Sequence, residues 1–391
     1  MKWQWDELGV VNEPLFPRCF PRHPMKIVLA GDWHSELHEG AVFGALRQMG
    51  HEVEKFSWHQ YFKSDDAQSG SLSRLLLKVQ NKYLLGPRIN RLNDDLVALA
   101  SREQPDAVFI YRGSHIRPET LRALRKACPG SVLVGYNNDD PFSPRYPRWL
   151  WRHYLGSVPE YDLVLAYRHR NLDELRAMGA KRAELLRSWF VPELHHPLEL
   201  SADERTQYGC DIVFIGHYED DGRLQYLEEV ARRGWKLRIF GPGYEWDSVL
   251  RQSALLAVHA PTRLVWGRDY SLALCGAKVG LCFLSKLNRD TYTRRCFEIP
   301  ACGTVLMSEF SDDLAGLYQA DREAVFFSSP DEMGDKLDRL LGDLAARDAV
   351  AAAGLRQVWQ GRHEVVSRMQ DVIGWIEELK GPKNDGTALD H

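Results

Sequence analysis

The sequence predicts an α/β protein with two Rossmann-like, doubly wound domains that face a cleft. Short apolar runs rich in β-branched residues alternate with longer amphipathic stretches along most of the chain, which is typical of parallel sheets with helices on both faces. The length of 391 residues exceeds what a single core usually supports, and the alternation starts again near residue 211. Together these observations favour two domains.

The first series of elements follows an N-terminal extension, residues 1–24, in which four prolines predict an extended lead-in. Strands are expected at 26–30, 107–111, 132–136 and 162–166, and helices at 40–49, 88–102, 118–127 and 169–178. We assign these elements to a first domain, residues 25–190.

The second series follows a linker, residues 191–210, which we infer from two prolines and weak periodicity near its start. Strands are expected at 211–215, 236–240, 279–284, 304–308 and 324–328. Helices are expected at 223–233, 270–277, 312–319 and 330–344, and along the C-terminal stretch that runs to Leu379. These elements form a second domain, residues 211–362. Residues 363–391 are expected to form a C-terminal helix and tail that can return to the first domain.

The composition is that of an ordinary globular protein and argues against several classes. A formal charge of 50 − 54 = −4 leaves no electrostatic footprint for non-specific nucleic-acid binding. The longest apolar stretch, residues 272–284, is shorter than the roughly 20 residues that span a bilayer and is interrupted by Lys278. The N-terminus carries charges where a signal peptide has its apolar core, so we expect a cytoplasmic protein without a transmembrane segment.

Seven cysteines without a C-x-x-C pair predict reduced, mostly buried thiols rather than a disulfide framework or a structural zinc site. The chain also lacks the motifs G-x-G-x-x-G, G-x-x-x-x-G-K-S/T, G-x-S-x-G and H-E-x-x-H. Their absence argues against a dehydrogenase, a P-loop enzyme, an α/β-hydrolase and a zinc hydrolase. We therefore expect no metal site and no permanently bound cofactor.

The most informative segment is residues 283–308, where a polar loop and a short helix separate two expected strands. The helix is expected to start around 291–293, capped by Thr291 or Thr293, so that its free amide N–H groups and positive dipole end form an anion site. The loop before it carries three polar side chains, Lys286, Asn288 and Asp290.

Two arginines and a glutamate follow in the same segment. The guanidinium groups of Arg294 and Arg295 suit a phosphate, since each can bind two oxygens at once. Glu298 lies four residues after Arg294, so both side chains share a helix face. A carboxylate there can accept hydrogen bonds from both hydroxyls of a ribose. The alternative is a solvated Arg294–Glu298 ion pair, and the spacing by itself leaves both interpretations open.

The string TRRCFEIPACG at Thr293–Gly303, preceded by AKVGLCFLSKLNRD, resembles the nucleotide-sugar-binding half of glycosyltransferases of the GT-B fold, in the branch similar to the CgeB spore-maturation protein family. Weaker similarity runs from Phe214 to the region near Gly354. The resemblance implies the GT-B architecture, a C-terminal domain of the glycosyl transferases group 1 type, and a hexosyltransferase-like enzyme whose donor is a nucleoside diphosphate sugar.

The same resemblance also implies roles for two acidic residues. Many such transferases carry two acidic residues separated by seven others, and the second holds the donor ribose. Asp290 and Glu298 have that separation here, with Asp in place of the usual first Glu. The resemblance thus implies that Glu298 binds the ribose.

Two further loops of the second domain are candidates for donor binding. Gly216 and His217 follow its first expected strand, and Arg223 begins the next expected helix, which suits a phosphate. Gly241 follows the second expected strand and allows a close approach of the backbone. Two aromatic residues follow it, Tyr244 and Trp246. They can either stack on a base or pack the domain edge.

In the first domain, polar residues that follow two strands are candidates for acceptor binding and catalysis. His34 comes after the expected strand 26–30 and is either a base or a structural, hydrogen-bonding residue. Asp139 and Asp140 come after the expected strand 132–136, where one carboxylate can remove a proton from the attacking oxygen. The alternative is that both aspartates build a turn or cap the next helix.

These observations lead to a glycosyltransferase that moves a sugar from a nucleotide-sugar to an unidentified glycan, protein or small molecule. The second domain would bind the donor diphosphate, and the first would present the acceptor. Two alternatives remain. One is a sugar-nucleotide epimerase or hydrolase of the same fold, which needs no acceptor; the other is a non-catalytic protein that binds sugar nucleotides.

Overall fold

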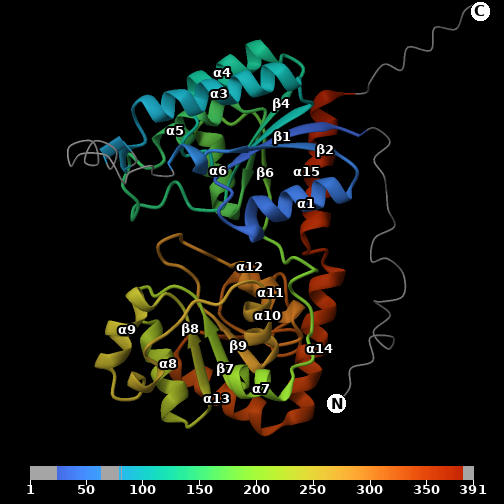
Figure 1. The fold of residues 1–391 in the computed structure, drawn as a ribbon. Helices are drawn as coiled ribbons and strands as arrows, with labels where there is room; N and C mark the ends of the chain where they lie inside the picture. Colours follow the sequence, from blue (N-terminus) through green and yellow to red (C-terminus); the bar gives the residue numbers. More distant parts are fainter. Residues whose placement is uncertain (1–23, 63–78, 81, 382–391) are drawn as a thin grey trace, which may run out of the picture. The chain divides into compact units, whose positions relative to one another are not determined.

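A computed structural model describes residues 24–62, 79–80 and 82–381 (Figure 1). Nearly all of the extension expected at 1–24, and the end of the expected C-terminal tail, lie outside the described residues. The described chain divides into two compact units. Unit 1 holds the residues up to Arg187 and those from Val365 onward, and unit 2 holds Ser188–Glu364.

The sheet of unit 1 has six parallel strands in the order β2-β1-β3-β4-β5-β6. They are β1 (Lys26–Gly31), β2 (Glu52–Ser57), β3 (Ala107–Tyr111), β4 (Val132–Asn137), β5 (Leu163–Ala166) and β6 (Ala183–Leu185). The sequence predicted the four central strands, because their apolar runs are buried on both faces. It missed the two edge strands, since β2 reads EVEKFS with only Phe56 buried and β6 is three residues long.

Helices surround this sheet, and the last helix of the chain is one of them. In chain order they are η2 (Glu36–Gly40), α1 (Ala41–Gln48), η3 (His59–Tyr61), α3 (Pro87–Glu103), α4 (Pro118–Ala127), α5 (Arg152–Ser157), η5 (Val158–Glu160), α6 (His169–Ala177) and α15 (Val365–Lys380). α15 packs against α1 and β4. Ion pairs from Lys380 to Asp106 at 2.5 Å and from Glu378 to Arg182 at 2.7 Å hold it there.

Unit 2 has a sheet of five parallel strands in the order β11-β10-β9-β7-β8. They are β7 (Cys210–Ile215), β8 (Leu237–Phe240), β9 (Ala277–Cys282), β10 (Val305–Glu309) and β11 (Val325–Phe327). The sequence predicted all five to within a few residues. Side chains of the strands, such as Ile212 and Val279, form the core together with Leu227 and Leu337 of the covering helices. Both units are therefore parallel α/β folds, as predicted.

The helices of unit 2 include two that the sequence analysis missed. The set is α7 (Ala202–Tyr208), α8 (Arg223–Arg232), α9 (Gly243–Gln252), η6 (Ala257–His259), α10 (Gly267–Cys275), α11 (Arg295–Ala301), α12 (Asp312–Ala315), α13 (Pro330–Gly342) and α14 (Leu344–Gln360). α7 lies inside the expected linker and starts at a capping box between Ser201 and Glu204. α9 begins directly after Pro242, in a stretch whose glycines indicated a loop.

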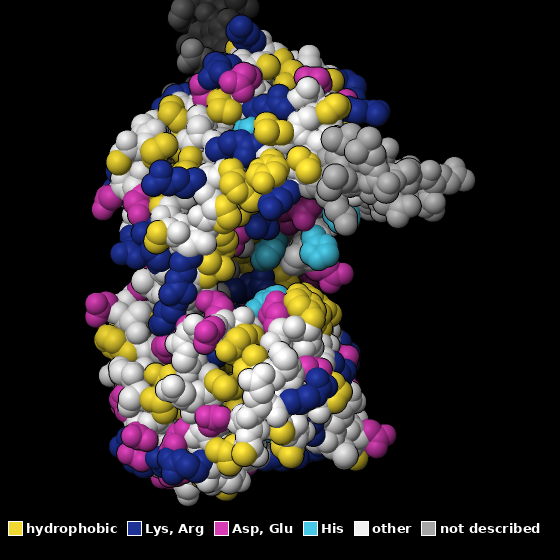
Figure 2. All heavy atoms as spheres, turned by 90° about the vertical axis from the view of Figure 1, so that its left-hand side faces the viewer, with side chains coloured by type: hydrophobic (Ala, Val, Ile, Leu, Met, Phe, Trp, Pro, Cys, Tyr) yellow, Lys and Arg dark blue, Asp and Glu magenta, His cyan; other side chains and the backbone are white. Residues whose placement is uncertain are grey.

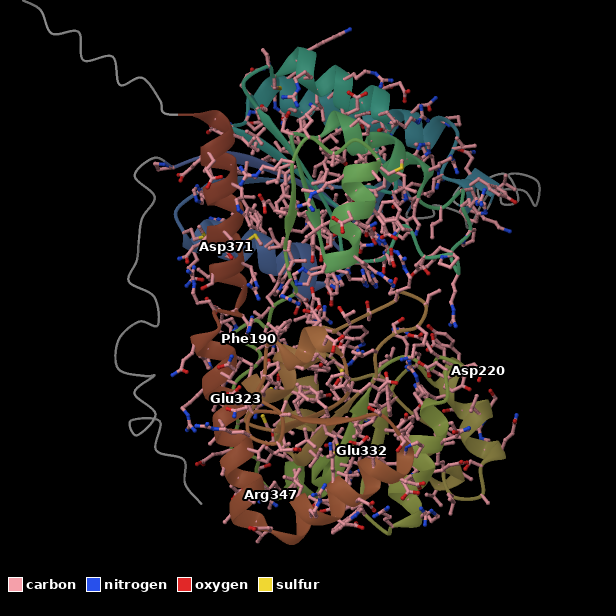
Figure 3. All side chains as sticks on the ribbon, turned by 180° about the vertical axis from the view of Figure 1, so that it is seen from behind. Phe190, Asp220, Glu323, Glu332, Arg347 and Asp371 are labelled. Carbon is pink, nitrogen blue, oxygen red and sulfur yellow. The ribbon has the colours of Figure 1, made fainter. Side chains whose placement is uncertain are left out.

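The linker into unit 2 lies beside the segment that leaves it. Phe190, labelled in Figure 3, donates its backbone N–H to the carbonyl oxygen of His363 at 3.1 Å and packs its ring against Trp359. Here α14 ends and α15 begins, because Arg362 adopts a left-handed φ of 54°. The two segments thus form one small, hydrogen-bonded crossing within unit 2.

Candidate active site

The carboxyl ends of β7 and β8 meet at the edge of the unit 2 sheet where ligands of α/β proteins usually bind. A Cβ on Gly241 would lie 2.3 Å from the carbonyl oxygen of Gly216, so this close approach requires glycine. The indole of Trp246 donates to the same oxygen at 2.8 Å and is fully buried, which makes it a core residue. Tyr244 is 83% exposed on the first turn of α9, so of the two aromatics only Tyr244 is placed to stack on a base.

Arg295, the first residue of α11, places its guanidinium group beside Gly216. A Cβ on Gly216 would lie 3.1 Å from Nη2 of Arg295. The Nε of Arg295 is buried without a hydrogen-bond partner, and no acid of the described chain forms an ion pair with this side chain. A guanidinium group without an internal partner is suited to bind an oxyanion. The end of β7 is therefore a candidate anion site around Arg295.

Arg223, the first residue of α8, is bound to the loop that precedes it. Its Nε and Nη2 donate to Asp221 at 2.8 and 2.7 Å, and its Nη1 donates to the carbonyl oxygen of His217 at 2.6 Å. Glu219 lies a further 3.4 Å from Nη2. Since the donors are used inside the protein and the side chain is buried, we correct the predicted phosphate role of Arg223: it shapes the loop after β7.

His217 and Lys286 are exposed cations or potential cations at the same edge of the sheet. His217 Nδ1 lies 3.0 Å from Glu245, and Lys286 Nζ lies 3.2 Å from Glu309. Each of these carboxylates also accepts a backbone N–H of the loop that it supports. The two acids therefore hold the loops after β7 and β9 and orient the exposed groups beside them.

The helix expected at 291–293 begins later, at Arg295, and lacks the predicted cap. The Thr293 hydroxyl lies 3.2 Å from the Cys282 sulfur in a buried position, and Arg294 at the N-cap makes no side-chain cap. The chain between β9, which ends at Cys282, and α11 therefore continues as a loop past Thr293. The anion site thus depends on the Arg295 side chain, and the predicted capping role of Thr293 is wrong.

The loop between β9 and α11 is a structured turn. The Ser285 carbonyl oxygen accepts the backbone N–H of Asp290 at 2.9 Å, and the Ser285 hydroxyl accepts the backbone N–H of Asn288 at 3.2 Å. This turn brings both predicted donor-site residues to the same sheet edge as Gly216. Their contact with a donor stays a prediction.

Glu298 lies at the centre of a buried cluster. Its side chain has no exposed surface, and its two oxygens lie 2.5 Å from Arg294 Nε and 2.5 Å from the Tyr270 hydroxyl, which donates to it. His195 Nε2 is 3.6 Å away. His195 Nδ1 accepts the backbone N–H of Val191 at 3.0 Å, so the ring proton of the neutral imidazole is on Nε2 and faces the carboxylate.

The cluster keeps Glu298 ionised although it is buried. Burial disfavours the charged carboxylate, but the Arg294 guanidinium, helped by the hydrogen bond from Tyr270, outweighs this effect and lowers the pKa of Glu298. Burial lowers the pKa of His195 to about 4, so this histidine is neutral at neutral pH. The Arg294–Glu298 pair exists as the spacing indicated, but it is enclosed and not solvated. A ribose would reach this carboxylate only if Tyr270 or Arg294 moved away.

The sequence analysis missed His195 and Tyr270 because neither is near Glu298 along the chain. His195 belongs to the expected linker, and Tyr270 begins the expected helix 270–277, so the local pattern gave them no role. Tertiary packing alone brings them together. The one local signal was a His-His pair in a stretch without periodicity.

In unit 1 the two predicted aspartates have different surroundings. Asp140 is fully buried, and its Oδ1 accepts the backbone N–H of Phe142 at 3.1 Å and the amide of Asn171 at 3.0 Å. Asp140 therefore builds the turn after β4, the alternative that the sequence had left open. Asp139 is partly exposed and forms an ion pair with Arg112 at 2.8 Å.

The loop after β1 carries His34, an exposed residue whose ring lies 6.0 Å from that of His59. Glu39, which the sequence analysis missed, is buried in the same region and accepts the backbone N–H of Asp32 at 2.9 Å. Burial raises the pKa of Glu39.

Two bulky residues at these strand ends have a left-handed backbone, with φ of 59° at Trp33 after β1 and 69° at Arg112 after β3. Such conformations are rare outside glycine and concentrate at functional sites. The ends of β1, β3 and β4 are therefore a second candidate region.

The described residues show neither of two further features. None of their helices is long and apolar enough to cross a membrane. Among the same residues, no group of three or more His, Cys, Asp or Glu side chains is arranged to hold a metal ion.

Comparison with protein families gives one match. Residues 223–374, which run from α8 into α15, match a family described as glycosyl transferase-like. No curated protein matches the chain significantly.

Comparison with solved structures identifies the fold. HepE from Anabaena, in complex with UDP and glucose, is 13% identical, with a TM-score of 0.60 over 90% of this chain and 99% of that one. Sucrose-phosphate synthase from Thermosynechococcus elongatus is 12% identical, with a TM-score of 0.64 over the same shares. A UDP-forming α,α-trehalose-phosphate synthase from Burkholderia vietnamiensis is 14% identical, with a TM-score of 0.59 over 90% and 99%. The chain thus has the GT-B glycosyltransferase fold.

Proposed function

We propose that this protein is a glycosyltransferase that moves a hexose from a UDP-sugar to an acceptor hydroxyl. Unit 2 binds the donor, and unit 1 binds the acceptor. The glycosyl transferase-like match lies mainly in unit 2, and HepE, which shares the fold, was solved with UDP and with UDP-glucose. The CgeB-like string at Thr293–Gly303 supports the same assignment, because it spans the start of α11.

The observation that carries the proposal is the unpaired guanidinium of Arg295 beside Gly216. A diphosphate is the part of a nucleotide-sugar that needs such a partner. Arg295 can hold two of its oxygens, and Lys286 supplies a second positive charge from the neighbouring loop. The neighbouring Arg294 is engaged by Glu298, so we assign the phosphate contact to Arg295.

The reaction breaks the bond between the anomeric carbon and the phosphate oxygen and forms a bond from that carbon to the acceptor oxygen. Negative charge develops on the departing UDP, and a cation already in place stabilises it without reorganisation. The acceptor hydroxyl loses its proton. Asp139 is the proposed base of unit 1, because it is partly exposed whereas Asp140 is enclosed.

Replacement of Arg295 tests the donor site. Arg295→Ala should weaken UDP binding about tenfold to a hundredfold, since hydrogen bonds to charged groups contribute about 1.5–3 kcal/mol. Uridine affinity should not change, because uridine has no phosphate. Arg295→Lys is the matched control that keeps the charge but loses the bidentate geometry, so its affinity should be intermediate. Calorimetric titration measures all three, and unchanged UDP affinity in folded Arg295→Ala would overturn the assignment.

Product analysis separates the proposed activity from its alternatives. UDP-glucose is incubated with the protein alone and with a panel of sugar, lipid and peptide acceptors. A transferase forms a glycosylated product only with an acceptor. Conversion of the donor without an acceptor would indicate an epimerase or hydrolase, and binding of UDP without turnover would indicate a non-catalytic protein.

A further inference from the structure

Two segments of unit 1 that are distant in the sequence form one basic and aromatic surface. Residues 79–93 contain Lys82, Arg88 and Arg91, residues 141–159 contain Arg145, Arg148 and Arg152, and neither stretch contains an Asp or Glu. The whole chain has a charge of −4, so this concentration of positive charge is local. The net charge of these two segments is therefore positive, whereas that of the whole chain is negative.

Specific contacts join the two segments. Arg152 donates to the carbonyl oxygens of Trp149 at 2.7 Å and of Leu84 at 3.2 Å. His153 Nε2 lies 2.9 Å from the same Leu84 oxygen, and the rings of Tyr83 and Trp149 lie 5.2 Å apart. We call this joint face, formed by residues 79–91 and 144–152 as far as they are described, the basic-aromatic surface.

Most of the positive charges of this surface have no ion-pair partner within the described chain. Arg91 pairs with Asp95 at 3.7 Å. Five other basic residues of the surface form no ion pair with a described acid: Lys82, Arg88, Arg145, Arg148 and Arg152. Lys82 instead lies over the ring of Tyr83, at 5.4 Å from its centre. Long side chains of this kind can extend their charges away from an apolar surface.

Apolar side chains are exposed between these charges. Val79 is 44% exposed, Tyr83 39% and Leu85 50%. Figure 2 views the side of unit 1 that carries α5 in Figure 1, and there hydrophobic side chains gather among Lys and Arg side chains. Exposed aliphatic and aromatic side chains surrounded by basic residues are typical of the boundary between water and lipid.

We propose that the basic-aromatic surface binds an anionic lipid membrane. Lys82, Arg88, Arg145 and Arg148 contact lipid phosphates, while Val79, Tyr83 and Leu85 enter the boundary between headgroups and acyl chains. Arg152 instead joins the two segments through its bonds to backbone carbonyls. A soluble polyanion such as nucleic acid would satisfy the charges but would leave the aliphatic side chains in water. The surface therefore fits lipid better than a polyanion.

A second group of exposed apolar residues lies in unit 2. Its charges show why we assign only the basic-aromatic surface to a membrane. Val258 and Trp266 are even more exposed there, at 84% and 63%. However, the nearby arginines each lie beside an acid, with Arg251 to Asp247 at 3.4 Å and Arg268 to Glu204 at 3.0 Å. That group has no comparable excess of positive charge, so we do not assign it to a membrane.

Vesicle sedimentation of the full chain, without nucleotide, tests the proposal. We expect binding to vesicles of phosphatidylcholine and phosphatidylglycerol in equal parts, and none to phosphatidylcholine alone. Binding should weaken with salt, because the Debye length falls from about 10 Å at 0.1 M to about 3 Å at 1 M. Failure to bind the anionic vesicles would overturn the proposal.

Variants locate the binding to this surface. Arg145→Glu with Arg148→Glu should lower vesicle affinity at least about twenty-five-fold, since each basic residue near an anionic membrane contributes about fivefold and the new carboxylates are repelled. Leu85→Asn should lower it about fivefold through lost apolar contact. The matched controls are Arg322→Glu with Arg339→Glu, and Leu344→Asn, which change exposed residues of unit 2. These should bind as the unaltered chain does.

The remaining outcomes also decide the matter. Equal losses in the controls would show that net charge alone drives binding, and this would overturn the proposal. Displacement by soluble heparin together with no effect of Leu85→Asn would indicate a polyanion site and would overturn it too. Circular dichroism and thermal melts confirm that each variant is folded. Because Arg295→Ala should lose UDP affinity but keep vesicle binding, the membrane proposal and the proposed function fail separately.

Discussion

The strand ends of the two units carry opposite chemistry. At the end of β7 in unit 2, Arg295 is a cation without an internal partner. At the ends of β1 and β3 in unit 1, Arg112 is paired with Asp139, and the loop after β1 holds the buried Glu39 and the exposed His34. A free cation suits an anionic leaving group, and carboxylates suit proton removal from a hydroxyl. Under the proposed function, two similar sheets serve different halves of one transfer reaction through the residues that follow their strands.

A second contrast lies within α11 and its N-cap. Arg294 and Arg295 are neighbours in the sequence, but Arg294 turns to the buried Glu298 and Arg295 turns to Gly216. The first supports the structure of unit 2, and the second is free to bind an anion. The following experiments test these two contrasts.

The largest effect is expected for the buried cluster. Glu298→Ala should lower the free energy of unfolding of unit 2 by about 3–5 kcal/mol, because it leaves the buried Nε of Arg294 and the Tyr270 hydroxyl without the carboxylate between them. Urea unfolding measures the change. The double variant with Arg294→Ala should recover part of the loss, since neither charge then stays unpaired. A loss below about 1 kcal/mol in the single variant would contradict the structural role.

Acid should destabilise unit 2 through His195. Its pKa is about 4 in the folded chain, against an ordinary histidine value of 6.5, so the unfolded chain binds the extra proton between these values. The free energy of unfolding should therefore be highest above pH 6.5. It should fall by up to about 3 kcal/mol as the pH drops toward 4. Urea titrations at a series of pH values should show a flatter dependence for His195→Gln.

The comparable group in unit 1 gives the contrast. His115 packs against Trp58 and Phe62, and burial lowers its pKa to about 3. The window of lost stability should then extend about one pH unit lower than for His195, and His115→Gln should flatten that lower part. If both variants keep the full pH dependence of the unaltered chain, neither histidine is the acid-sensitive group.

Turnover should distinguish the two aspartates of unit 1. Asp139→Asn should lower kcat about a hundredfold and leave UDP affinity unchanged, because the base acts on the acceptor. Asp140→Asn should mainly lower stability, since Asp140 holds the turn after β4. Steady-state kinetics and thermal melts of both variants measure this. Equal turnover in Asp139→Asn would remove the proposed base.

The smallest effect is expected for Lys286. Its ammonium group is exposed and shared with Glu309, so Lys286→Ala should weaken UDP binding only about threefold to fivefold. This is well below the loss expected for Arg295→Ala. Calorimetry at low and high salt compares the two variants, and an equal loss in both would show that Arg295 has no special position.

Much of the fold could be read from the sequence because buried parallel strands leave a strong local signal. The central strands of unit 1 and all strands of unit 2 were predicted from apolar runs such as AVFIY and DIVFI. The edge strand β2 was missed because a half-exposed strand need not be apolar. The helix α9 was missed because glycine and proline, which usually signal a loop, here stand at its start.

The candidate site was predicted less completely, and the errors have one cause. The sequence pointed to residues 283–308, to Gly216 and to Asp139, and their contacts with substrates stay predictions. The spacing paired Arg294 with Glu298, but it did not show that this pair is buried and that Arg295 instead lies beside Gly216. Nor did it show that the Arg223 guanidinium donates its hydrogen bonds to Asp221, two residues away.

The sequence by itself determined the order of strands and helices, the α/β class and the segments that follow each strand, because these depend on short-range patterns of burial and turn formation. Only the tertiary structure decided which charges are neutralised. Ion pairing falls steeply with distance and depends on burial, and the partners of Glu298 come from the linker, from α10 and from the start of α11. The same packing leaves the Arg295 guanidinium beside Gly216 without an ion-pair partner in the described chain.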